Sequence, residues 1–110
     1  MSAISADGRS MTSDQLLAVR VPISLGHLLY LDALQRRDDR AARAAVNEAT
    51  THLAEVVAGR PWSCSHRVWA VYLLDDLRRL SRQLDAWAFW RDADRIFSGA
   101  IAELAKHRST

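Results

Sequence analysis

Several residue types whose abundance marks other classes of protein are scarce in this chain of 110 residues. The single cysteine, Cys64, excludes a disulfide framework within one chain and fits a reducing compartment. No apolar run approaches the roughly 20 residues that a membrane-spanning helix needs. The first residues lack a charged segment followed by an apolar one, so no signal peptide is predicted. We therefore expect a cytoplasmic protein with no membrane partner.

An excess of charge of one sign is also missing. The formal net charge is only +2, and it divides into zero over residues 1–24, −1 over 25–59 and +3 over 60–110. No segment is a polycation, so binding to nucleic acid would depend on the placement of a few arginines. The charge alone does not indicate a protein that binds polyanions.

The composition that remains is that of one globular domain. Hydrophobic residues make up 49% and charged residues 25% of the sequence, which argues against disorder over most of its length. We expect a disordered polar leader over residues 1–13 and a single, mainly α-helical domain over residues 14–108.

Helical periodicity begins after Ser24. One helix is predicted over residues 25–37 with Ser24 as its N-cap, and a second over residues 40–58 with Asp39 as its N-cap. Gly59, which a proline follows closely, is expected to end the second helix.

Residues 65–106 carry two successive apolar stripes at helical spacing. A single long helix and two helices that meet near residues 82–87 both fit this pattern. We favour two helices, because a small domain must fold back on itself to bury both stripes.

Four tryptophans are many for this length and predict a large hydrophobic contact surface. Trp69 and Trp87 lie on the first apolar stripe and are predicted to be core residues. Trp62, beside the turn, and Trp90, off that stripe, are the predicted residues of a partner interface.

The segment before Ser24 fits two structures. Leu17, Val19 and Val21 alternate with Leu16, Ala18 and Arg20, and this period of two, ending at a proline, predicts a short strand. A helical turn over residues 14–20 is the competing prediction, because Thr12 and Gln15 have the spacing of a capping box.

No constellation of residues indicates chemistry. Cys64 and His66 are too few for a metal site, which needs about four ligands, and nothing marks an oxyanion site beside them. Asp75-Asp76 and Asp92-x-Asp94 each have arginines three or four residues away, so we expect ion pairs on solvated helix faces. We predict a protein that is not an enzyme, with no catalytic residue, no metal and no cofactor.

The joint spacing of three motifs resembles the ribbon–helix–helix family of DNA-binding proteins over residues 17–53. The motifs are Val19-Arg20-Val21-Pro22-Ile23-Ser24-Leu25, Leu31-Asp32-Ala33-Leu34 and Val46-Asn47-Glu48-Ala49, with Leu53 beyond. The resemblance implies a homodimer whose paired strands enter the major groove of DNA. It also implies that Leu16, Ala18 and Arg20 face the DNA, and that the start of the second helix, with Arg40 and Arg43, lies near a phosphate.

Two hypotheses of function follow. The first is a small dimeric DNA-binding regulator (a repressor, an antitoxin-like regulator or a plasmid-transfer accessory protein), with a ribbon–helix–helix-like part over residues 14–58 and a Trp-rich helical hairpin over residues 62–108. The alternative is an all-α four-helix bundle that binds a protein partner through its Trp-rich half, as an adaptor, antiactivator or immunity-type protein. The structure of residues 17–22, strand or helix, distinguishes the two hypotheses.

Overall fold

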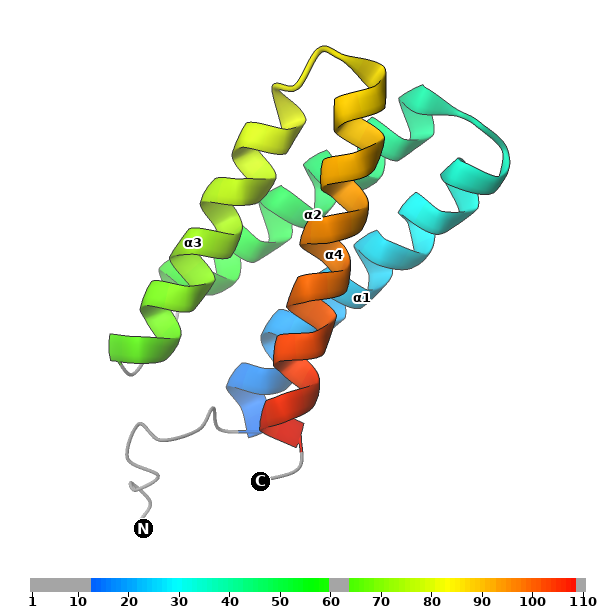
Figure 1. The fold of residues 1–110 in the computed structure, drawn as a ribbon. Coiled ribbons are helices and arrows are strands. Elements are labelled where there is room, and N and C mark those ends of the chain that lie inside the picture. The colour runs from blue at the N-terminus through cyan, green and yellow to red at the C-terminus, as the bar shows by residue number, and fades with distance from the viewer. Residues whose placement is uncertain (1–12, 60–63, 109–110) are drawn as a thin grey trace, which may run out of the picture.

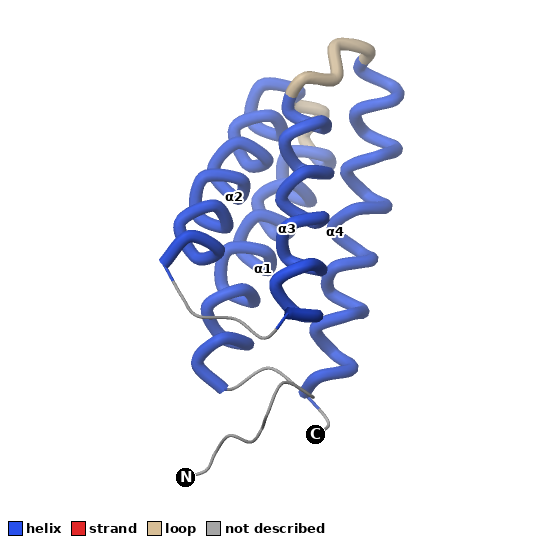
Figure 2. The backbone as a smooth tube through the Cα atoms, turned by 90° about the vertical axis from the view of Figure 1, so that its left-hand side faces the viewer, coloured by secondary structure: helices blue, strands red, loops and turns tan. Residues whose placement is uncertain are grey.

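The computed structural model describes the backbone of residues 13–59 and 64–108, and the side chains of residues 18–59 and 67–106. Over this described part the chain forms four helices and no strand. The helices are α1 (Ser13–Gln35), α2 (Asp39–Gly59), α3 (Cys64–Ser81) and α4 (Ala86–Arg108). Successive helices run in opposite directions, as an up-and-down bundle (Figures 1 and 2). The predictions of a mainly α fold and of a four-helix bundle are confirmed.

Each helix packs against two others. α1 contacts α2 and α4, and α3 also contacts α2 and α4, so the four helices surround one hydrophobic core. The largest side chains that are fully buried come from all four helices: Val19, Ile23, Tyr30, Val46, Leu53, Leu77, Phe89 and Phe97. No helix of the described part is both long and apolar enough to cross a membrane. The predicted leader, apart from Ser13, lies outside the described residues.

The predicted strand over Leu17–Val21 is wrong, because these residues lie inside α1 together with Pro22. An interior proline costs a helix about 3 kcal/mol through a lost hydrogen bond and a clash with the carbonyl four residues earlier. Burial explains why the helix forms nevertheless. The helical register buries Val19 and Ile23 completely, and each such burial stabilises by about 1.5–3 kcal/mol. In a strand Val21 would share a face with Val19, yet in α1 it is exposed.

The connection between α1 and α2 is a Schellman motif. The amide of Asp38 donates to the carbonyl of Ala33 (2.9 Å) and the amide of Arg37 donates to the carbonyl of Leu34 (3.1 Å). Arg37 has a φ of 53°, in the left-handed region that glycine usually occupies at this position. The N-cap of α2 is Asp38, whose Oδ1 accepts from the amide of Ala41 (3.0 Å). The prediction of Asp39 as N-cap was therefore wrong by one residue.

The predicted start of a helix after Ser24 is also wrong, because Ser24 lies inside α1, which ends at Gln35 rather than at residue 37. The later boundaries agree better with the sequence. α2 ends at Gly59, and the two-helix interpretation of the C-terminal half is confirmed by the break between Ser81 and Ala86. Arg43 of α2 stabilises this break. Its Nη1 donates to the carbonyl of Gln83 (2.6 Å), and its guanidinium lies 4.4 Å from the centroid of the Phe89 ring.

Candidate interaction surface on helix α1

The outward side of α1 is apolar. Val21, Leu25 and Leu28 follow one another at intervals of four and three residues, and each leaves 45–64% of its surface exposed. Leu29 lies on the α2 side of this row. We call the exposed apolar residues of α1 together the α1 apolar face; its members are Val21, Leu25, Leu28, Leu29, Leu31 and Leu34.

The α1 apolar face is large for a protein of this size. We put its exposed side-chain surface on the order of 500 Å², near the upper end of what a monomeric protein shows as one patch. A surface helix normally keeps a polar stripe toward water, whereas a helix that is hydrophobic on all sides is normally covered on all sides. In this bundle α1 is covered on its inner side only.

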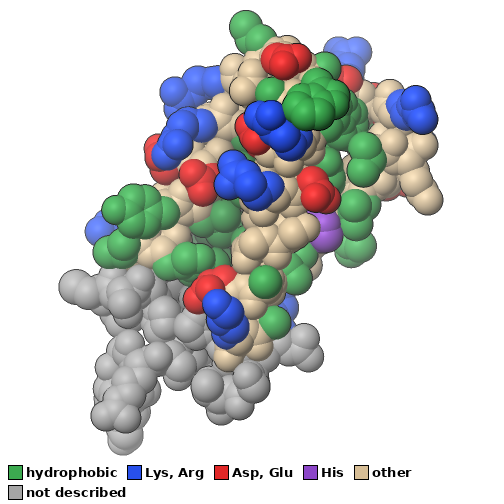
Figure 3. Space-filling model, viewed as in Figure 1, with side chains coloured by type: hydrophobic (Ala, Val, Ile, Leu, Met, Phe, Trp, Pro, Cys, Tyr) green, Lys and Arg blue, Asp and Glu red, His purple; other side chains and the backbone are tan. Residues whose placement is uncertain are grey.

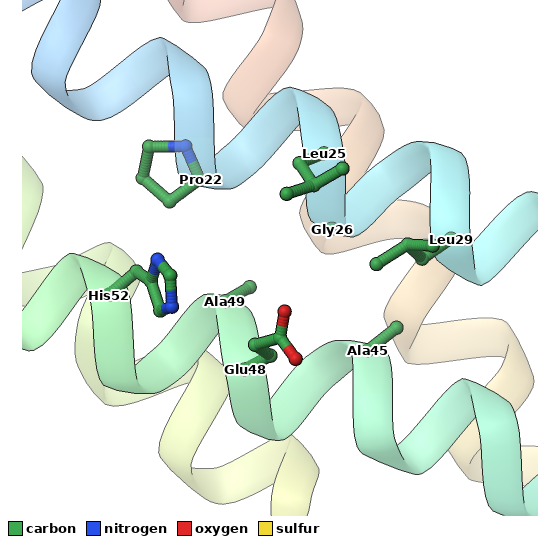
Figure 4. A pocket seen from close by; sticks show the side chains of 8 residues that line it. All are labelled: Pro22, Leu25, Gly26, Leu29, Ala45, Glu48, Ala49 and His52. Atoms are coloured by element: carbon green, nitrogen blue, oxygen red, sulfur yellow. The ribbon is translucent and has the colours of Figure 1, made fainter.

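The furrow between α1 and α2 continues this face, and Figure 4 shows its lining. It is lined by Pro22, Leu25, Gly26, Leu29, Ala45, Glu48, Ala49 and His52. The two helices approach closely because the facing residues are small. A Cβ placed on Gly26 would lie 2.9 Å from the Cβ of Ala49 and 3.3 Å from Cε1 of Phe97.

The hollow left in this furrow is too small for a ligand. Its volume is about 10 Å³, room for about one water molecule, whereas small-molecule sites span about 300–1,000 Å³. The furrow can therefore receive side chains of a second macromolecule but not a cofactor. In the part of the chain that the structure describes, no three His, Cys, Asp or Glu residues are placed to hold a metal ion.

Carboxylates at the edges of the α1 apolar face lack ion-pair partners among the described residues. Glu48 lies at the α2 edge, in the furrow. Asp94 lies on the α4 side. Burial, and in second place the charge of Asp94, raise the pKa of Tyr30, whose hydroxyl donates to the carbonyl of Trp90 (2.9 Å).

Several other acidic residues of the bundle are paired with arginine. Asp32 contacts Arg36 at 3.0 Å, and Asp75 contacts Arg79, which holds the pKa of that carboxyl below its usual value by hydrogen bonding and by charge. Asp92 contacts Arg91 at 3.2 Å. Both signs of charge are interspersed over the side of the molecule shown in Figure 3. The expected ion pairs with arginines three or four residues away are thus confirmed for Asp75 and Asp76, both with Arg79, and for Asp92 with Arg95, but not for Asp94.

The residues predicted to contact DNA do not form one face. Ala18 and Arg20 are half-buried in α1, and residues spaced by two on a helix point in nearly opposite directions. Nη2 of Arg20 is buried without a hydrogen-bond partner. Leu16 lies in α1, but its side chain is outside the described residues. Arg40 is exposed near the start of α2, whereas Arg43, one turn further on, joins α2 to the α3–α4 loop.

The tryptophans are placed differently from the prediction. Trp87 was expected in the core but is 69% exposed, with the guanidinium of Arg91 5.1 Å from its ring centroid. The loop after Ser81 interrupts the helical phase, so the stripe that leads to Trp87 does not continue on one face. Trp69 is half-buried against the core.

The two predicted interface tryptophans are only partly described. Trp62 lies outside the described residues. Trp90 is half-buried, with ring centroids 5.7 Å from Tyr30 and 5.8 Å from Phe89. It also borders an open cleft of about 590 Å³ at the end of the bundle, together with Leu34.

The sequence interpretation missed the α1 apolar face. Leu25, Leu28, Leu31 and Leu34 follow each other at three-residue spacing, which is consistent with the predicted helix but did not indicate that all four are exposed. The unbroken run Leu28-Leu29-Tyr30-Leu31 was the available signal of an exposed apolar residue. Four successive apolar residues occupy a full helical turn, so at least one of them must face away from the core.

Comparison of the chain with protein-family models, with curated proteins and with solved structures found no match.

Proposed function

We propose that this protein is an all-α protein–protein interaction module that receives its partner on the α1 apolar face. The observation that carries the proposal is an outer helix whose exposed residues from Val21 to Leu34 are all apolar except Asp32. Leu28, at the centre of the face, is 64% exposed. Covering such residues removes apolar surface from water, which is the main driving force of protein association.

The contrast with the rest of the surface supports the same proposal. α3 has fewer exposed apolar residues, Val68, Val71 and Tyr72, beside the Asp75–Arg79 pair. The outward positions of α2 include Arg40, Asn47, Glu48 and Thr51, and α4 carries the Asp92–Arg91 pair. Polar surfaces of this kind need no partner. Apolar surface of the extent found on α1 is typical of an interaction site.

The alternative hypothesis, a DNA-binding regulator, loses its main support. That hypothesis depended on a strand over residues 17–21 that pairs with a second chain, and these residues lie within α1. Several arginines that could contact phosphate are engaged with carboxylates instead, among them Arg36, Arg43 and Arg79. A protein partner therefore fits the bundle better than a DNA duplex.

A capture experiment with matched variants tests the proposal. The tagged protein, a Leu25→Ser/Leu28→Ser double variant and a Leu84→Ser control would be used to isolate binding proteins from the source cells. Leu84 is 90% exposed in the α3–α4 loop, away from α1. We expect a partner that the wild type and the control retain and the double variant loses, with unchanged far-UV circular dichroism.

Two results would contradict the proposal. One is a partner retained equally by all three proteins, which would place the interface elsewhere. The other is a mobility shift of DNA by the wild type at moderate salt that the double variant also gives, since this would indicate binding of DNA independently of the α1 apolar face.

A further inference from the structure

From the carboxylates at the edges of the α1 apolar face, we infer that the partner presents a basic amphipathic helix that lies along the furrow between α1 and α2. The inference rests on the proposed function and adds the chemistry of the partner. Two observations carry it: the shape of the furrow, and the carboxylates on the α2 and α4 sides of α1.

The furrow has the form of a shallow apolar track. Leu25 and Leu29 stand one helical turn apart on α1, and both line it together with Pro22 (Figure 4). Because Gly26 and Ala49 bring the two helix backbones close together, the furrow stays shallow along this length. A track of this kind suits the apolar stripe of a helix, whose side chains recur at three- and four-residue spacing.

The two sides of α1, toward α2 and toward α4, carry carboxylates at their edges. Glu48 reaches the furrow from α2 and has no ion-pair partner among the described residues. Asp94 belongs to α4, on the side of α1 away from the furrow. It likewise has no ion-pair partner in the described part, and its charge contributes to the raised pKa of Tyr30 of α1. Lysine or arginine on the flanks of a docked helix would complement both edges. The pairs at Asp32, Asp39, Asp75 and Asp92 show that this chain has arginine beside most of its other helix-surface carboxylates.

A second copy of the chain fits these edges poorly. In an antiparallel two-fold pairing of α1 helices, the α2 edge of one copy faces the α2 edge of the other, so Glu48 approaches its own equivalent. In a parallel two-fold pairing the α2 edge faces the α4 edge, so Glu48 approaches the side that carries Asp94. Either symmetric arrangement sets carboxylates against each other, which is unfavourable at an interface. A separate, basic partner avoids this repulsion.

Binding of two designed peptides to the full chain tests the inference. One is a helix of about 18 residues, roughly five turns, with leucine on one face and lysine on the other. The second has glutamate in place of every lysine. Fluorescence anisotropy of labelled peptide would be measured with the wild type, with Glu48→Gln, with Leu25→Ser/Leu29→Ser, and with Asp85→Asn. Asp85 is an exposed carboxylate of the α3–α4 loop, so its variant controls for net charge.

The expected pattern is specific. The lysine peptide binds the wild type about tenfold or more tightly than the glutamate peptide does. Glu48→Gln weakens the lysine peptide about two- to fivefold, as loss of one exposed ion pair predicts, and Asp85→Asn leaves it unchanged. The double leucine variant weakens it more than about tenfold.

Other outcomes overturn the inference in distinguishable ways. If both peptides bind the wild type equally and neither binds the double leucine variant, the docking surface is correct but the inference of a basic partner is wrong. If the leucine variant binds as well as the wild type, the proposed function fails too. Sedimentation velocity tests whether a second copy of the chain occupies the face. A wild-type dimer at micromolar concentration that Leu28→Ser converts to a monomer would show that it does, and would overturn the inference.

Discussion

A Cβ on Gly26 would lie 2.9 Å from the Cβ of Ala49, so α1 and α2 cross at a distance that only glycine allows at this position. Real Cβ atoms do not approach so closely, and Phe97 of α4 blocks the other side at 3.3 Å. The contact brings three helices together and fixes the depth of the furrow beside the α1 apolar face.

Gly26→Ala is therefore expected to destabilise the bundle, although alanine is the better helix former by about 1 kcal/mol. The added methyl group must push α1 and α2 apart, and overpacking of this kind costs about 1–3 kcal/mol. Gly99→Ala is the matched control, because a Cβ at that position of α4 meets nothing within 4 Å. It should stabilise the protein by about 0.5–1 kcal/mol. Urea unfolding of both variants measures the difference, and a stabilised Gly26→Ala variant would contradict the close crossing.

In the turn between α1 and α2, by contrast, a substitution is expected to raise the stability of the protein. Arg37 holds a φ of 53° at a position where glycine carries no steric cost. Arg37→Gly should stabilise the protein by about 0.5–1 kcal/mol, since the relief of strain exceeds the added freedom of the unfolded chain. The control is Gln35→Gly in the last helical position of α1, which should destabilise by up to about 1 kcal/mol. Equal effects of the two changes would mean that the turn is not of the Schellman type.

Arg43 is expected to matter for stability rather than for DNA binding. It joins Asp39 at 3.0 Å, the carbonyl of Gln83 and the ring of Phe89. Loss of these contacts in Arg43→Ala should cost about 1–2 kcal/mol in thermal or urea unfolding. The exposed Arg40 has no such contacts, and Arg40→Ala should change stability by less than about 0.5 kcal/mol. If Arg43→Ala unfolds like the wild type, the α3–α4 loop is held by other contacts.

Stability should fall at alkaline pH because of Tyr30. Burial, with a smaller contribution from Asp94, raises the pKa of this phenol in the folded state. The unfolded chain therefore releases the proton more readily, and the stabilisation present below pH of about 10 is lost as the pH rises through the folded-state pKa. Unfolding at pH 8 to 11 would show the decline, and Tyr30→Phe should flatten it. A decline of equal slope in Tyr30→Phe would assign it to other groups.

The sequence predicted those features that depend on local signals. Gly59 marks the end of α2, and the need to fold back predicted the break between α3 and α4. The structure of α1 depends on tertiary burial instead. An alternating pattern before a proline is a strand signal, whereas the spacing of Thr12 and Gln15 indicated a helix. Contacts with α2 and α4 decide between the two in favour of the helix.

The interaction surface could not be predicted for a related reason. The inward positions of α1 are Val19, Ile23, Tyr30 and Ala33, while its leucines from Leu25 to Leu34 are exposed. When a helix is apolar on all sides, periodicity does not tell which side meets the core. The side that faces the core is determined by how closely neighbouring helices can pack. Here the small residues Gly26 and Ala49 allow α1 and α2 to approach, and this contact exists only in the folded bundle.

Substitution of Pro22 tests whether residues 17–22 are helical, as the functional proposal requires. In α1 it lacks the amide that would bond to the carbonyl of Ala18, so Pro22→Ala should restore a helical hydrogen bond. We expect a net gain of about 1–2 kcal/mol in unfolding free energy, after the loss of some packing in the furrow, where Pro22 is buried. Backbone chemical shifts of Ala18–Val21 should be helical in both the wild type and the variant. Extended shifts in the wild type, with no gain in stability on substitution, would restore the strand and with it the DNA-binding hypothesis.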